Sequence, residues 1–139
     1  FRTWTERIDA WWPQSHRPSG DAGAVVGLEG YEDGRIFERT SEGVEHVWGK
    51  VIAWEPTWHF GYDWYLGSGV EQPTRVDVVF RADGDGTRVE VTHRGPELVG
   101  EIWTRNVARY VASWDVVLSA YLAACDTQEF ELERMEGME

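Results

Sequence analysis

The chain has 139 residues, of which 42% are hydrophobic and 27% charged, a composition typical of one globular domain and not of a disordered or fibrous chain. Its 25 acidic residues outnumber its 13 basic ones and give a net charge of −12, so phosphate backbones and anionic membrane surfaces would repel it. We therefore expect neither a nucleic acid nor a membrane as its partner.

The sequence shows no secretion leader and no membrane-spanning segment. Its longest apolar run, between residues 116 and 125, is much shorter than the ~20 residues that a bilayer helix needs. The single cysteine, Cys125, has no second cysteine with which to form an internal disulfide, as is usual in a reducing compartment. Together these features predict a cytoplasmic protein.

The opening of the chain predicts two short helices. Phe1, Trp4 and Ile8 follow helical spacing, and Pro13 ends the second helical turn. The polar stretch at 14–21, which contains proline and glycine, predicts a loop.

Six strands separated by tight turns are predicted after this loop. The turns are too short to hold crossover helices, so each strand should pair with its sequence neighbours in antiparallel fashion. The expected strands are 24–30, 35–40, 44–54, 58–66, 74–81 and 87–94.

Alternation of apolar and polar residues assigns inward faces to three of these strands. In strand 44–54 both faces carry apolar residues, so its inward face stays open, and Gly49 is a candidate for a β-bulge. The residues expected to face inward are Trp58, Phe60, Tyr62, Trp64 and Leu66, then Val76, Val78 and Phe80, and finally Val89, Val91 and His93.

A helix from about residue 101 to 125 is predicted by apolar residues at steps of three and four. A curved sheet with one apolar face must bury that face against this helix, which gives an α+β fold. One helix about 10 Å wide does not fill a broad curved sheet, so an open space is expected between them. The chain has nine tryptophans, which predict either an aromatic core or an aromatic lining of this space.

Several short stretches, in this order, resemble one protein superfamily. They are FRTWTERIDAWWP at 1–13, LEGYEDGR at 28–35, WGKVIAWEP at 48–56, GTRVEVTHRG at 86–95, and WDVVL at 114–118 followed by Tyr121 and Leu122. The chain is similar to the SRPBCC (START-like, helix-grip) superfamily, and most similar to its branch named after the activator of the heat-shock protein 90 ATPase. The resemblance spans residues 1–125, nearly the whole sequence.

The resemblance implies a helix-grip fold, in which a curved antiparallel sheet wraps around a long C-terminal helix and two short helices stand near the start. We expect one such domain at 1–126 and a solvated acidic tail at 127–139. Members of the superfamily enclose a cavity for apolar ligands and include lipid binders, aromatic polyketide cyclases and co-chaperone modules. The fold alone therefore leaves the function open.

The family pattern has seven strands, of which six are visible here, and it begins with a strand before the first helix. We expect that first strand to lie upstream of the sequence in hand. If it is absent altogether, strand 87–94 is left as an open edge of the sheet. Such an edge invites pairing with another chain, so a homodimer formed through it is one expectation.

Residues expected to line the cavity are inward aromatic rings and one histidine. The alternative for each ring is plain core packing. His93 is placed to act as an acid or base toward a ligand, and its alternative is a core histidine bonded to a hydroxyl such as that of Tyr62 or Tyr110. The candidates are Trp12, Phe60, Tyr62, Trp64, Phe80, His93, Trp103, Tyr110 and Trp114.

No motif for a metal or a cofactor stands out. The four histidines lack metal-ligand spacing, and the run of aspartate and glycine at 83–86 reads as a hairpin turn because a calcium loop beginning there would need a glutamate where Arg94 stands. We expect no metal and no cofactor. The leading hypothesis is binding, without catalysis, of a small aromatic or lipid-like molecule. The alternatives are a cyclase- or dehydratase-like enzyme that uses His93, and a co-chaperone-like interaction module.

Overall fold

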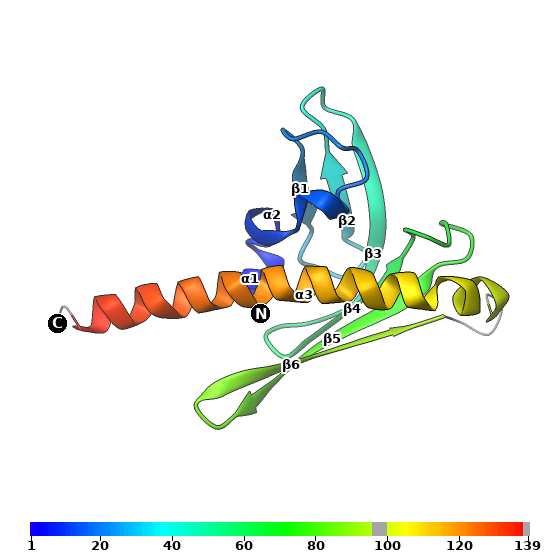
Figure 1. Ribbon diagram of the computed structural model, residues 1–139. Coiled ribbons are helices and arrows are strands. Elements are labelled where there is room, and N and C mark those ends of the chain that lie inside the picture. Colours follow the sequence, from blue (N-terminus) through cyan, green and yellow to red (C-terminus); the bar gives the residue numbers. More distant parts are fainter. Residues whose placement is uncertain (96–99, 138–139) are drawn as a thin grey trace.

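A six-stranded antiparallel sheet and one long helix make up most of the molecule (Figure 1). The computed structural model describes the backbone of residues 1–95 and 100–137 and the side chains of residues 1–95 and 107–125. The helices are α1 (Arg2–Thr5), α2 (Ile8–Trp11), the 3₁₀ turn η1 (Gln14–His16) and α3 (Gly100–Gly137). The strands are β1 (Val25–Leu28), β2 (Arg35–Arg39), β3 (Glu45–Glu55), β4 (His59–Trp64), β5 (Thr74–Asp83) and β6 (Gly86–Arg94).

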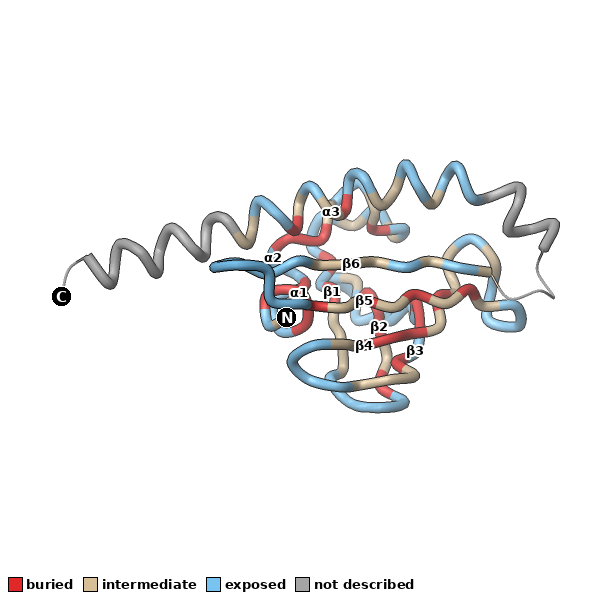
Figure 2. The backbone as a smooth tube through the Cα atoms, turned by 90° about the horizontal axis from the view of Figure 1, so that it is seen from below, coloured by how far each residue is buried: buried red, intermediate tan, exposed pale blue. Residues whose placement is uncertain are grey.

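Each strand pairs with its sequence neighbours, in the order β1-β2-β3-β4-β5-β6, and every pair is antiparallel. The sheet curls, and α3 runs across its inner side (Figures 1 and 2). The predicted α+β helix-grip architecture is confirmed. Within the described chain β1 and β6 are the two edges of the sheet, and pairing of β6 with a second chain stays a prediction.

Strand β3 carries two irregularities. Ile36 of β2 pairs with Gly49 and Phe37 pairs with Val47, so Trp48 is an additional residue on β3. A second shift lies between Val51 and Ala53, where β3 pairs with β4. Each bulge changes which side chains point inward, and this is why the sequence of β3 has apolar residues on both faces. A bulge is therefore present where the sequence predicted one, with Trp48, the residue before Gly49, as the additional residue.

The inward faces predicted for β4 and β5 are confirmed, with one exception. Phe60, Tyr62 and Trp64 are buried on β4, but Trp58 is 51% exposed. Trp58 lies in the turn that precedes β4, so the alternation of the strand does not extend back to it. Inward residues of β6 are only half-buried, because this strand stands at the edge of the sheet.

Helix α3 is longer than the sequence predicted and is buried along a narrower stripe. It continues from residue 125 to Gly137, and among its described side chains, 107–125, Val117 and Tyr121 are the buried ones. Val111 and Leu122, which belong to the predicted apolar stripe, are 58% and 57% exposed. A straight helix meets a curved sheet along a line, so the flank of its apolar stripe stays outside. None of the helices in the described chain is both long and apolar enough to cross a membrane.

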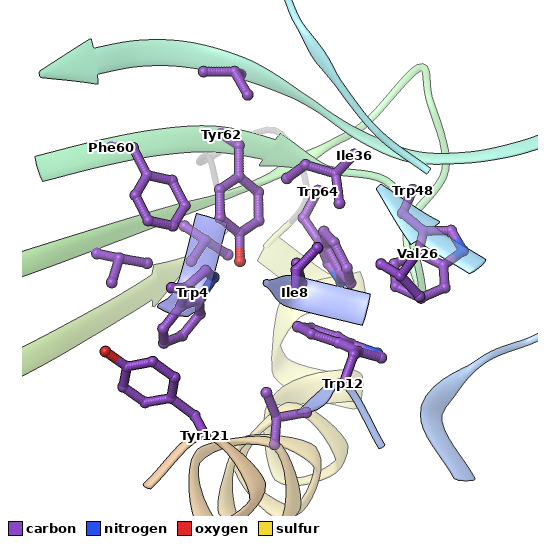
Figure 3. Close-up of a cluster of buried hydrophobic side chains, with 14 of the residues drawn as sticks. Trp4, Ile8, Trp12, Val26, Ile36, Trp48, Phe60, Tyr62, Trp64 and Tyr121 are labelled. Atoms are coloured by element: carbon purple, nitrogen blue, oxygen red, sulfur yellow. The ribbon is translucent and has the colours of Figure 1, made fainter. Parts of the chain in front are cut away.

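The N-terminal helices fill one end of the space between the sheet and α3. Trp4 of α1 is 1% exposed, and its ring lies 6.0 Å from that of Phe60 and 4.8 Å from that of Tyr121 (Figure 3). Phe1 completes the packing, with its ring 5.3 Å from that of Phe80. This end of the interior is therefore occupied by the protein's own rings.

A buried arginine fastens these short helices to the sheet. The Arg17 guanidinium donates to the Asp9 carboxylate at 2.9 Å and to the carbonyl oxygen of Ala24 at 3.0 Å. The same Asp9 carboxylate accepts the backbone N–H of Val26 on β1 at 2.8 Å. Because a charge-assisted hydrogen bond is short and strong, this arrangement holds α2 and η1 in place beside the remaining open space.

Candidate functional site

A pocket of about 290 Å³ opens at the end of the molecule where β4 and β6 finish. One side is a stretch of α3, the facing side is the segment around η1, and the floor comes from β4, β6 and the loop after β4. The lining residues are Trp12, Ser15, His16, Pro18, Trp64, Leu66, Gly67, His93, Arg109, Tyr110, Ser113, Trp114 and Val117. Pockets for small ligands usually measure roughly 300–1,000 Å³, so this one suits a compact ligand.

Two indole rings form a rigid wall of the pocket. The rings of Trp12 and Trp64 lie 6.1 Å apart, and each also packs against Trp48, at 5.5 and 6.0 Å (Figure 3). The indole N–H of Trp12 donates to the carbonyl oxygen of His16 at 3.1 Å, so its polar edge is already satisfied within the protein. Such a wall offers aromatic surface at little conformational cost.

His93 lies on β6 at the pocket, and both of its ring nitrogens have protein partners. The indole N–H of Trp114 donates to Nδ1 at 2.9 Å, and Nε2 lies 2.8 Å from the hydroxyl of Thr74. An indole N–H only donates, so Nδ1 carries the lone pair and the proton of the neutral ring is on Nε2. That proton is therefore directed at the Thr74 hydroxyl oxygen.

Burial lowers the pKa of His93 to about 4, since removal from water disfavours the charged imidazolium. His93 is thus neutral near pH 7. The ring of Tyr110 lies 4.3 Å from the His93 ring, and the Tyr110 hydroxyl donates to the carbonyl oxygen of Leu66 at 3.2 Å. The hydroxyl that binds His93 belongs to Thr74, whereas the sequence suggested Tyr62 or Tyr110. These bonds hold His93 as part of the wall.

The mouth of the pocket is polar. Arg109 and Ser113 stand one turn apart on α3, and Ser15 and His16 lie on the η1 side, where the Ser15 hydroxyl is 2.9 Å from His16 Nδ1. Sequence analysis missed these residues because it followed the apolar stripe of the helix. A usable signal was present: Arg109 and Ser113 each immediately precede a predicted pocket residue, Tyr110 and Trp114.

The structure divides the predicted site residues into two groups. Phe60, Tyr62 and Phe80 lie in the core away from the pocket lining, and burial raises the pKa of the Tyr62 hydroxyl above its usual range. The Trp103 side chain is outside the described residues. The predicted residues that do line the pocket are Trp12, Trp64, His93, Tyr110 and Trp114.

No group of three or more histidine, cysteine or acidic side chains is positioned to hold a metal ion in the part of the chain that the structure describes. The lining residues instead present rings, aliphatic side chains, hydroxyls and one guanidinium. Such a lining can bind a ligand by stacking and hydrogen bonding.

The curled antiparallel sheet, the C-terminal helix and the end pocket define this molecule as a helix-grip protein. Comparison with protein-family models gave no match, and comparison with curated proteins gave none either. Solved structures that resemble it include an anthrahydroquino-gamma-pyrone synthase, Txn09, with 30% sequence identity and a TM-score of 0.50. That match covers 68% of this chain and 66% of the synthase, which is just under two thirds of its length.

Two further solved structures share the fold at low identity. Protein NE0264 from Nitrosomonas europaea has a TM-score of 0.62 and 9% identity, over 92% of this chain and 85% of its own. Protein Ms6760 from Mycobacterium smegmatis has a TM-score of 0.53 and 14% identity, over 91% of this chain and 78% of its own. At these identities the likeness concerns the fold alone.

Proposed function

We propose that the protein binds a small, flat aromatic molecule with polar substituents in the end pocket. The observation that carries this proposal is the lining, in which the rings of Trp12, Trp64 and Trp114 surround an opening with hydroxyls and a guanidinium at its mouth. Rings bind flat rings through dispersion and offset stacking, and the mouth supplies donors for oxygen substituents on the ligand's rim.

An aromatic ligand fits this pocket better than a lipid chain. The volume of about 290 Å³ is small for a long acyl chain, and the interior that could have extended it is filled by Trp4 and Phe1. The sequence left aromatic and lipid-like ligands open, and the compact pocket favours the first.

The likeness to the synthase supports the same class of ligand. That protein is named for a product with fused aromatic and pyrone rings, and its sequence is 30% identical over 68% of this chain. A ligand built from fused oxygenated rings matches both that name and the lining of this pocket.

The binding test uses 1,8-dihydroxyanthraquinone as the probe and isothermal titration calorimetry as the readout. We expect a dissociation constant in the micromolar range or below, and much weaker binding of 1-dodecanol. Ser113→Trp should fill the pocket from the side of α3 and weaken binding by about tenfold or more. Ser119→Trp is the matched control, because Ser119 is exposed on the same helix and does not line the pocket.

Binding of the quinone no better than millimolar would contradict the proposal. Equal affinity of the Ser113→Trp variant and the unchanged protein would contradict this pocket as the binding site. Both variants are first checked for an unchanged unfolding midpoint, so that lost binding is not mistaken for lost folding.

A second candidate function is a cyclase-type enzyme that acts on a polyketide-like substrate, and the observation that favours it is the likeness to the synthase. His93 is poorly suited to be its acid or base, because Nδ1 accepts from Trp114 and Nε2–H is engaged by Thr74. The test is incubation with a linear poly-β-carbonyl thioester, followed by mass spectrometry of ring-closed products. No acceleration over buffer would contradict this candidate and leave the binding proposal in place.

A further inference from the structure

The charge of the pocket differs from the charge of the chain. The protein has 25 acidic residues against 13 basic ones. Yet among the described residues that line the pocket there is no aspartate or glutamate, and Arg109 is the one side chain with a permanent charge. The described part of the lining therefore carries a positive charge, in contrast to the net negative charge of the chain.

Arg109 is also not committed to an ion pair. Most arginines of the described sheet are paired, as Arg35 is with Glu29 at 3.0 Å and Arg75 with Asp77 at 3.2 Å. No ion pair or hydrogen bond joins the Arg109 guanidinium to any other side chain within residues 1–95 and 107–125. The Arg109 side chain is exposed, and within these residues no partner competes with a ligand for its guanidinium.

The helix itself supplies no carboxylate to Arg109. Side chains three and four positions away are the helical neighbours that form ion pairs. For Arg109 these positions hold Arg105, Asn106, Ala112 and Ser113, none of which is acidic. The absence of an acidic partner at these helical positions therefore follows from the sequence and does not depend on the rotamer of Arg109.

The positive charge of Arg109 acts on Tyr110, which is part of the wall of the pocket. Burial raises the pKa of the neighbouring Tyr110 hydroxyl, and the positive charge of Arg109 acts in the opposite direction. A guanidinium presents parallel N–H donors that match the two oxygens of a carboxylate. Ser113, one turn further along α3, adds a hydroxyl on the same side of the mouth.

We propose that the ligand of this pocket is an aromatic anion, whose carboxylate or ionised phenolic oxygen binds Arg109 at the mouth while its ring lies against the indole wall. This inference rests on the proposed function and narrows it to acidic aromatic molecules. Arg109 is the residue that selects the charge of the ligand.

The test compares two probes of nearly equal size and shape, the anionic 2-naphthoate and the neutral 2-naphthamide, by isothermal titration calorimetry. The unchanged protein should prefer the naphthoate, and raising the salt concentration from about 50 mM to 500 mM should reduce the preference through screening. Arg109→Gln should weaken naphthoate binding by about tenfold and leave naphthamide binding within about twofold.

Arg7→Gln is the matched control, since Arg7 is exposed, lies outside the pocket and loses the same charge. Equal affinity of the two probes for the unchanged protein, or the same preference in Arg109→Gln, would overturn the inference while leaving aromatic binding intact. Failure of both probes and of the quinone to bind would remove the proposed function itself, and the inference with it.

Discussion

At the scale of single residues, His93 shows how a neighbouring ring decides the chemistry of a titratable group. The indole N–H of Trp114 donates to Nδ1, which accepts only when it is unprotonated. The other ring nitrogen, Nε2, is hydrogen-bonded to the hydroxyl of Thr74. The alternation of β6 was enough to predict that His93 faces inward. Its partners come from β5 and α3, 19 and 21 residues away in the chain, and no local pattern specifies them.

The neutral state of His93 should make stability depend on pH. The pKa is about 4 in the folded protein and about 6.5 when unfolded, so between these values the unfolded chain binds more protons. The contribution of His93 to the free energy of unfolding should therefore have its full value above pH 6.5 and decrease as the pH drops toward 4. After allowance for screening at a half-buried site, we expect a loss of about 1–2 kcal/mol.

Urea unfolding at pH 7 and pH 5 measures this loss. In His93→Gln the difference between the two pH values should shrink, because the titrating group is gone while all carboxylates remain. The same difference in both proteins would show that His93 does not carry the effect.

Replacing Trp114 by phenylalanine should raise the pKa of His93 above about 4, while burial continues to hold it below 6.5. The variant removes the indole N–H that stabilises the unprotonated Nδ1, and it keeps an aromatic ring in place. A pH titration of the imidazole resonance by NMR measures the change. Trp54→Phe is the control, since Trp54 packs at the other end of the interior against Phe1. An unaltered His93 pKa in Trp114→Phe would contradict the role of this hydrogen bond.

At the scale of elements, turn chemistry and alternation predicted all six strands and their neighbours, because short turns leave antiparallel pairing as the only choice. The same reasoning failed at Trp58, where alternation was carried past the start of β4, and on the flank of α3 at Val111 and Leu122. In both cases the sequence pattern is local, whereas the burial of a side chain depends on which other elements pack against it.

Beside the bulge at Trp48, the pairing of β3 with β4 requires a glycine, because the two backbones approach closely at Gly49. A Cβ atom at Gly49 would lie 2.3 Å from the carbonyl oxygen of Asp63 on β4. Gly49→Ala should therefore lower the free energy of unfolding by about 1–3 kcal/mol. Gly86→Ala is the matched control, where the nearest atom would be 3.7 Å away and a change below about 1 kcal/mol is expected. Equal urea midpoints for the two variants would contradict the argument.

At the scale of the whole molecule, the interior is divided between a filled end and an open end. The sequence predicted a curved sheet around a helix with aromatic rings between them, and the structure has this arrangement. The sequence did not predict which aromatic rings pack against each other in the core and which face the pocket. That division is made by Trp4 and Phe1, which pack against Phe60 and Phe80 and so close one end.

Trp4 should consequently be a major source of stability. Trp4→Ala removes a ring that is 1% exposed and leaves a cavity, with an expected loss of about 3–5 kcal/mol. Trp58→Ala removes an equally large ring that is 51% exposed, and the expected loss is below about 1 kcal/mol. Chemical denaturation measures both values, and a similar loss in the two variants would contradict the division of the interior described here.

The indole rings form a continuous series through the molecule. Neighbouring rings lie 6.2 Å apart from Trp114 to Trp4, 5.2 Å from Trp4 to Trp11 and 5.5 Å from Trp11 to Trp12, and the series continues through Trp48 to Trp64. Chromophores this close share their electronic excitation. Circular dichroism and emission of the protein are thus collective properties, and a molecule that touches one end of the series alters the optical signal of all six rings.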